Sequence, residues 1–158
     1  MLEIQRQAGQ GSGDNRVLAS VYNMTSATLA RGAVVQYYTS AAGLCDGFSV
    51  TIPTTNYLDL VAGIVSDSPN TSPSSSGILT LTCGFITIYG VVKYANLYTG
   101  ASVVPAVGDK LVPVAGQTYL QYVAAGDGRD GMFCCLSSYA SSTATSSGRN
   151  ISVYVHAM

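Results

Sequence analysis

From Val17 onward the chain is a succession of short runs rich in Val, Ile, Thr and Tyr, separated by turn residues. Each run is about 4–8 residues long, the usual length of a β-strand. No window of a dozen residues keeps apolar side chains at helical spacing without interruption by Gly, Pro or clustered β-branched residues. The predicted strands are Val17–Asn23, Val34–Thr39, Phe48–Ile52, Leu60–Val65, Ile78–Thr82, Phe85–Tyr89, Val91–Tyr94, Lys110–Val114, Tyr119–Val123, Met132–Tyr139 and Ile151–His156.

The last predicted strand shows the alternation most clearly, because Ile151, Val153 and Val155 fall on one face and Ser152, Tyr154 and His156 on the other. Many short strands at near-regular spacing are typical of a β-sandwich or a β-barrel, and the pattern does not choose between them. With 158 residues and no internal repeat, the chain is predicted to be a compact all-β single domain with little or no helix.

The first 16 residues have a different character. They are polar and contain Gly9, Gly11 and Gly13, the spacing of a flexible linker. We therefore expect a flexible N-terminal arm over 1–16 and a β domain over 17–158. The segment 1–16 has no apolar central region and no cleavage signal, so no secretory leader is expected and the protein should stay in the cytosol where it is made.

Two polar stretches interrupt the strands. Ser66–Gly77 is rich in Ser and Pro and predicts a long exposed loop, and Ser141–Arg149 predicts a second polar connection.

The most apolar stretch, Gly84–Val92, is followed by Lys93 and is about half the length of a membrane-spanning helix, so no membrane helix is expected.

Charge is unusually sparse. Seven Lys and Arg and eight Asp and Glu give a net charge of −1 and a charged fraction of 9%, while 47% of residues are apolar. Ordinary soluble domains are about 25% charged. The balance excludes disorder of the whole chain, which needs low hydrophobicity and high charge, and it does not favour a nucleic-acid partner.

The residues that could carry chemistry are few. His156 is the single histidine and no G-x-S-x-G motif accompanies it, so it is interpreted as an exposed polar position on the last strand. Cys45, Cys83, Cys134 and Cys135 form no C-x-x-C pair and are expected to be small apolar packing residues rather than disulfides or zinc ligands. No metal site and no cofactor are predicted.

The loop Gly126–Gly131 contains Asp127 and Asp130, but it does not match an EF-hand loop, so a tight turn is the preferred interpretation. The G-x-G-x-G pattern at Gly9–Gly13 follows no predicted strand and opens no helix, which argues against a phosphate-binding loop. The chain is therefore not expected to be an enzyme.

Eleven tyrosines accompany three phenylalanines and no tryptophan. Tyrosine is favoured both at protein interfaces and in half-buried strand positions, and both interpretations stay open for the set. The adjacent Tyr37 and Tyr38 cannot both face one core, so at least one ring should point outward or into a partner.

Strands with so few charges have little protection against edge-to-edge pairing, which predicts a homo-oligomer, expected to be a trimer.

Several segments between residues 17 and 123 resemble bacteriophage capsid decoration (cement) proteins. The resembling segments, in the expected order, are Val21–Asn23, Thr28–Gly32 with Val34 and Val35, Leu60–Val65, Gly84–Gly90 with Val91–Tyr94, and Val107–Leu111. They correspond to an opening hairpin with a "T-L-x-x-G" turn, an "A-x-G-I/V-V" strand, a "G-x-v-x-v-x-G-x-v" segment and an "x-G-D-x-L" turn. The Ser66–Gly77 loop is not part of that pattern, and the match is less clear from Gly126 onward.

The resemblance implies a β-tulip-like barrel or sandwich that binds the outer surface of a phage head as a trimer and clamps neighbouring major capsid proteins. It implies no catalytic pocket, and a location on the virion after synthesis in the host cytoplasm. Many such proteins use an N-terminal arm that orders on the shell, and alternation would select Leu2, Ile4 and Arg6 as capsid contacts. Tyr37 and Tyr38 are further candidates for that contact.

The alternative function is a receptor- or glycan-binding β domain, such as part of a tail fibre or a surface lectin. Exposed tyrosines and loops containing Asn or Asp suit sugar stacking and hydroxyl hydrogen bonding, whereas the absence of Trp argues against it.

Overall fold

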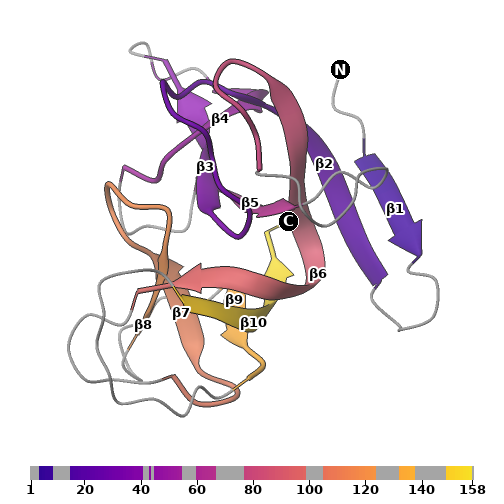
Figure 1. Cartoon of the computed structure of the whole chain (residues 1–158), viewed down its shortest axis with the longest axis vertical. Helices are drawn as coiled ribbons and strands as arrows, with labels where there is room; N and C mark the ends of the chain where they lie inside the picture. Colours follow the sequence, from indigo (N-terminus) through magenta and orange to yellow (C-terminus); the bar gives the residue numbers. More distant parts are fainter. Residues whose placement is uncertain are drawn as a thin grey trace.

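The computed structural model describes residues 4–8, 15–40, 43, 45–54, 60–66, 77–98, 105–123, 132–137 and 149–157, and for 4–8, 15, 149 and 150 the backbone alone. The predicted all-β class is confirmed: within these ranges the chain forms strands and no helix (Figure 1). The strands are β1 Ile4–Ala8, β2 Asn15–Asn23, β3 Val34–Thr39, β4 Cys45–Thr51, β5 Val61–Ser66, β6 Cys83–Leu97, β7 Lys110–Pro113, β8 Leu120–Tyr122, β9 Phe133–Cys135 and β10 Arg149–His156.

The choice between barrel and sandwich is settled by strand pairing, which closes a five-stranded barrel with extra strands attached. The ring runs β2–β4–β3–β5–β6 and returns to β2. Its closure depends on a short parallel pairing of β2 with β4, where Tyr22 lies opposite Ser49 and Asn23 opposite Val50. Every other pairing in this ring is antiparallel. We call it the first ring.

Strand β6 is long enough to serve a second ring. Its first half pairs with β2 and β5, and from Tyr89 onward it pairs with β10. The change falls next to Gly90, which has a φ of 108°, a value that favours glycine. The second ring continues through β9, β7 and β8 and returns to β6 by one parallel pair, Leu97 with Leu120.

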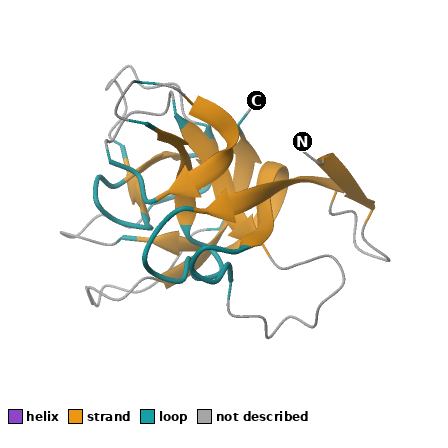
Figure 2. Cartoon of the chain, turned by 90° about the horizontal axis from the view of Figure 1, so that it is seen from above, coloured by secondary structure: helices purple, strands orange, loops and turns teal. Residues whose placement is uncertain are grey.

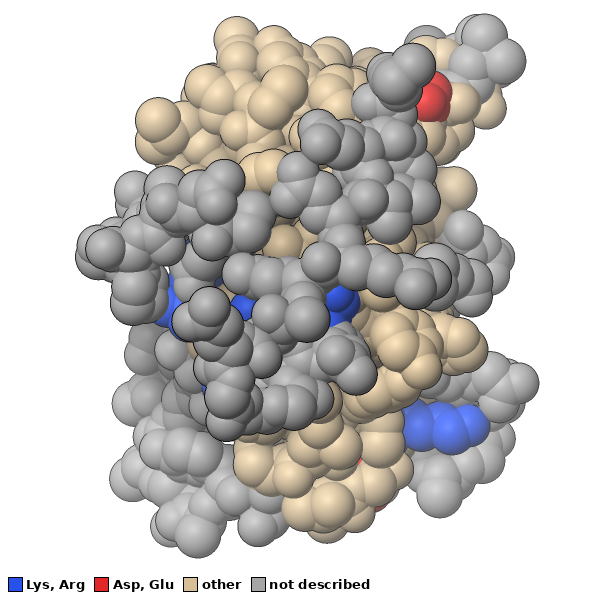
Figure 3. Space-filling view, turned by 90° about the vertical axis from the view of Figure 1, so that its right-hand side faces the viewer, with Lys and Arg blue, Asp and Glu red and all other residues tan. Residues whose placement is uncertain are grey.

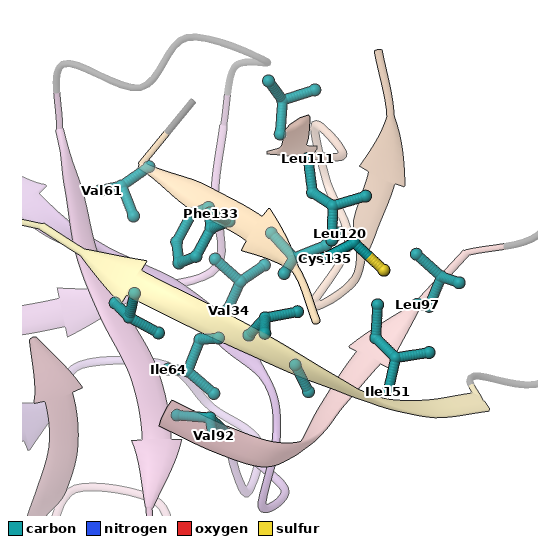
Figure 4. Close-up of a cluster of buried hydrophobic side chains, with 14 residues drawn as sticks. Val34, Val61, Ile64, Val92, Leu97, Leu111, Leu120, Phe133, Cys135 and Ile151 are labelled. Atoms are coloured by element: carbon teal, nitrogen blue, oxygen red, sulfur yellow. The ribbon is translucent and has the colours of Figure 1, made fainter. Parts of the chain in front are cut away.

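Each ring has its own hydrophobic core. The first core lies inside the first ring and contains Val21, Val35, Val50 and Ile86, among others. The second core surrounds the fully buried Phe133 and lies between the second ring and the outer side of β3 and β5 (Figure 4).

Strand β5 separates the two cores and is buried along its whole length. Val61 and Ile64 belong to the second core, whereas Ala62 and Val65 belong to the first. Gly63 marks the register shift that permits this arrangement, with a φ of 149°. A Cβ at this position would lie 2.4 Å from the carbonyl oxygen of Thr87, so the two strands approach too closely for a side chain.

Strand β10 confirms the predicted alternation, with Ile151, Val153 and Val155 buried and His156 exposed. Two predicted strands, Phe85–Tyr89 and Val91–Tyr94, are parts of the single strand β6, because Gly90 continues the ladder with a positive φ instead of ending it.

The predicted strand Ile78–Thr82 is wrong. Ile78 forms an isolated bridge with Leu29, and the chain then turns, with the Thr82 amide donating to the Leu79 carbonyl. Leu81 has a φ of 53°, which is incompatible with a strand. Alternation of leucine and threonine predicts a strand, but here it accompanies a turn that leads into β6.

Strand β1 and the first two residues of β2 fall within the predicted arm. β1 pairs antiparallel with β2, from Ile4 opposite Ala19 to Ala8 opposite Asn15. It is the last strand at its end of the sheet and lies beyond β2, away from the barrel (Figures 1 and 2). The predicted loop Ser66–Gly77, apart from its two ends, lies outside the described residues, as do Gly126–Gly131 and all of Ser141–Arg149 except Arg149.

Candidate functional site

The two candidate tyrosines of β3 are separated as their adjacency predicts. Tyr37 is half-buried and packs against the first core, and this burial, with Cys45 nearby, raises the pKa of its hydroxyl. Tyr38 is 38% exposed. Only Tyr38 thus offers a ring to a partner without rearrangement of the core.

Two of the three candidate contacts in the N-terminal segment, Ile4 and Arg6, belong to β1. Ile4 lies opposite Ala19 and Arg6 opposite Val17, so these two residues share one face of the strand. Leu2 lies outside the described residues. Because β1 ends the strand order, its second edge has no hydrogen-bonded neighbour within the described part of the chain. Such an edge can accept a further strand.

An aromatic group that no motif indicated lies on β6 and β10. The Tyr89 ring contacts Tyr154 edge to face with centroids 5.4 Å apart, and it contacts the His156 ring in the same way at 5.6 Å. A hydrogen bond with the Tyr89 side chain raises the pKa of Tyr154. Cys134 of β9 lies opposite Tyr154 in the ladder. We call Tyr89, Tyr154 and His156 the aromatic face.

Two arginines contact one tyrosine where the first and second rings of strands meet. The guanidinium carbon of Arg31 lies 3.5 Å from the ring centroid of Tyr94, a cation–π contact. Arg16 Nη1 lies 3.3 Å from the Tyr94 hydroxyl and 3.4 Å from Ser66 Oγ. Gly32 beside Arg31 donates its amide to Val65, so the group links β2, β5 and the second half of β6. These contacts connect strands β2 and β5 of the first ring with the part of β6 that belongs to the second ring.

Metal ligands do not gather in the described residues, where no group of three His, Cys, Asp or Glu side chains could hold an ion. All four cysteines are free thiols. Cys135 is buried as predicted, and burial is the main cause of its raised pKa. Cys45 and Cys83 are exposed, because each is the first residue of its strand. The prediction that all four cysteines are packing residues is therefore wrong.

The apolar end of the first ring was also missed. Leu79 and Leu81 are more than half exposed, and the exposed Met24 directly follows Asn23, whose backbone is hydrogen-bonded to Leu81 and Thr82. The alternating pattern predicted a strand at Ile78–Thr82, and a strand would place both leucines on one face of a sheet. No sequence pattern therefore indicated that they are exposed on a turn.

Comparison with known proteins finds no protein family whose model matches the chain, and no curated protein with significant similarity to it. In the described residues, no helix is long and apolar enough to cross a membrane.

Proposed function

We propose that this chain is a structural protein of a phage head, a decoration protein that binds the outer surface of the capsid as a homo-oligomer. Its partners are the major capsid protein and further copies of itself, expected to form a trimer. It adds stability by bridging neighbouring capsid subunits and carries out no reaction. It is made in the host cytoplasm and ends on the virion.

The observation that supports this proposal is the combination of sparse charge with exposed apolar side chains. Charged residues are 9% of the chain, and on the face in Figure 3 the described charged side chains are few and set apart. Large apolar side chains between 37% and 61% exposed are Met24, Tyr38, Leu60, Leu79, Leu81, Tyr98, Val107 and Leu136. Side chains of this kind form interface cores, where charged residues are depleted. Such a surface suits a protein that is occupied by partners.

Multivalency explains how modest contacts would suffice. A trimer held at several points on a shell gains effective concentration from each contact, so no single interface has to be strong. Interfaces of about 1,600 Å² each are adequate if they are well packed.

The test uses expanded heads that lack this chain, prepared from the virus whose genome encodes it. The purified chain should co-sediment with the heads to a saturating stoichiometry and raise the temperature at which they break. Analytical ultracentrifugation of the free chain at micromolar concentration should show an oligomer. A chain that stays in the supernatant with the heads pelleted would end the proposal.

A second candidate function is glycan binding, which the aromatic face favours. Tyr89 and Tyr154 are partly exposed and their rings lie edge to face, beside the exposed His156. Aromatic rings with polar tips suit the faces and hydroxyls of a sugar. A glycan array separates the candidates: specific binding that Tyr154→Ala abolishes, while head binding is absent, would favour this function.

A further inference from the structure

The apolar end of the first ring is built from two segments that are bonded to each other. The Leu81 amide donates to the Asn23 carbonyl at 3.2 Å, and the Asn23 amide donates to the Thr82 carbonyl at 3.0 Å. Met24, the next residue, donates its amide to Val50. Three side chains are left outside the fold at this end, with Met24 40%, Leu79 55% and Leu81 58% exposed. We call these three residues the barrel-end anchor.

The backbone beneath the anchor is held by one buried side chain. Asn23 is fully buried, and its Nδ2 lies 2.9 Å from the Ala27 carbonyl and 3.1 Å from the carbonyls of both Ile78 and Leu79. Its Oδ1 accepts from the amide and hydroxyl of Thr25. The anchor is therefore preorganised, and a partner would lose little free energy in ordering it.

Leu81 is unusual because a branched apolar residue occupies a left-handed conformation, with a φ of 53°. Gly or Asn adopts this conformation with less strain. A strained residue is normally kept where its side chain is needed. Leu81 is 58% exposed, so packing within the chain does not explain why a leucine stands there. Contact with another molecule does.

The area of the anchor identifies the kind of partner. A fully buried aromatic side chain covers about 150–250 Å², so three partly exposed smaller side chains fall far short of the roughly 800 Å² per partner that a stable dimer needs. A second copy meeting this end alone would not hold. The size instead fits a hot spot, a few apolar side chains that fill a pocket at the centre of a larger interface.

The surroundings of the anchor identify the chemistry of that pocket. Residues 23–30 and 77–84 contain no charged residue, and Thr80 and Thr82 alternate with the two leucines in the sequence. The corresponding end of the molecule, at the top of Figure 1, is largely free of described charges in Figure 3 apart from one red side chain. An uncharged rim around an apolar centre matches a pocket of the same composition and would leave a partner's charge unpaired.

From these observations we infer that Met24, Leu79 and Leu81 insert into an apolar pocket, with an uncharged rim, on the major capsid protein. The inference rests on the proposed function and specifies which end of the molecule meets the shell. It gives the strained Leu81 a purpose that the isolated fold does not.

The experiment measures the dissociation constant for expanded heads that lack this chain. The double variant L79S/L81N removes both leucines while Asn tolerates the φ of residue 81. Gln117→Ser is the control, because Gln117 is exposed on the turn between β7 and β8 and belongs to no proposed contact. Wild type and Q117S should bind equally, whereas L79S/L81N should bind at least tenfold more weakly, with a melting temperature no lower than that of wild type.

Leu81→Gly provides a second variant that fits the backbone and tests folding separately. It should unfold at a higher temperature than wild type and yet bind heads at least threefold more weakly. If wild type binds and both leucine variants bind with the same affinity, this inference alone is overturned. An equal loss of binding in Q117S would overturn it as well. Failure of the wild type to bind heads would overturn the proposed function, and this inference with it.

Discussion

Asn23 ties together two loops that are 55 residues apart in the chain, by donating from one amide group to the carbonyls of Ala27, Ile78 and Leu79. A buried polar group without partners costs about 1–3 kcal/mol, so such a side chain is kept only where its partners are in place. The pattern of apolar residues does not reveal this role of Asn23. An Asn as the last residue of β2 is also what an ordinary turn would have. Its role depends on a segment that lies far away in the sequence.

Asn23→Ala should therefore lower the free energy of unfolding by about 2–3 kcal/mol, because the Thr25 donors and the three carbonyls lose a buried partner. Thr25→Ala is the control, since Thr25 is less buried, and its loss should cost about 1 kcal/mol or less. Urea denaturation measures both. Equal costs for the two variants would show that the Asn23 side chain does not hold the loops.

Asp46 predicts a local dependence on pH. The Ser49 hydroxyl and the backbone amides of Phe48 and Ser49 donate to its carboxylate, and they hold its pKa below the ordinary value. Because the folded pKa is the lower one, the carboxylate stabilises the fold above its unfolded pKa, and this contribution is lost as pH falls through the folded pKa. Asp46 is exposed, so the effect is small.

Ser49→Ala removes the largest cause of that shift and should move the pKa of Asp46 upward toward its ordinary value. Titration of the carboxyl carbon by NMR in wild type and variant measures the change. The same pKa in both proteins would mean that the hydroxyl at 2.6 Å contributes nothing.

The strands show how far sequence patterns reach. Alternation located β10 and separated Tyr37 from Tyr38, because a period of two depends only on neighbouring residues. It failed at Ile78–Thr82, where the chain makes a local turn that is hydrogen-bonded to the distant Asn23. The closure of the barrel was also beyond reach, since the parallel pair of β2 and β4 depends on contacts between separate segments. The aromatic face could not be predicted either, because its residues come together only through the register of β6 against β10.

The close approach of β5 to β6 requires that residue 63 has no side chain. Gly63→Ala should cost about 4 kcal/mol, because strain at a φ of 149° adds to a contact of 2.4 Å with the Thr87 carbonyl. Gly108→Ala is the control: Gly108 has a φ of 93° but nothing within 4 Å of its added Cβ, so it should cost about 1–2 kcal/mol. The difference between the two unfolding free energies isolates the steric part. Equal losses would contradict the close approach of β5 and β6.

At the scale of the whole molecule, the two rings share β6, and β5 contributes side chains to both cores. The group of Arg16, Arg31 and Tyr94 adds a polar link between them. A unit that unfolds separately needs a boundary crossed by few contacts. Here a buried strand runs through the boundary, so the rings should behave as one cooperative unit although their cores are distinct.

Phe133→Ala tests this cooperation, because Phe133 is fully buried in the second core and lies outside the first ring. Its truncation should cost about 3–5 kcal/mol. If the rings unfold together, amide hydrogen exchange at the most protected positions of β2 and β3 should accelerate by the same factor as in β9 and β10, since every such amide then exchanges through one global opening. Acceleration confined to β7–β10 would mean that the second ring opens alone. In that case β6 would be a hinge between two units, and the barrel-end anchor, held on the first ring, would keep its binding to heads in the same variant.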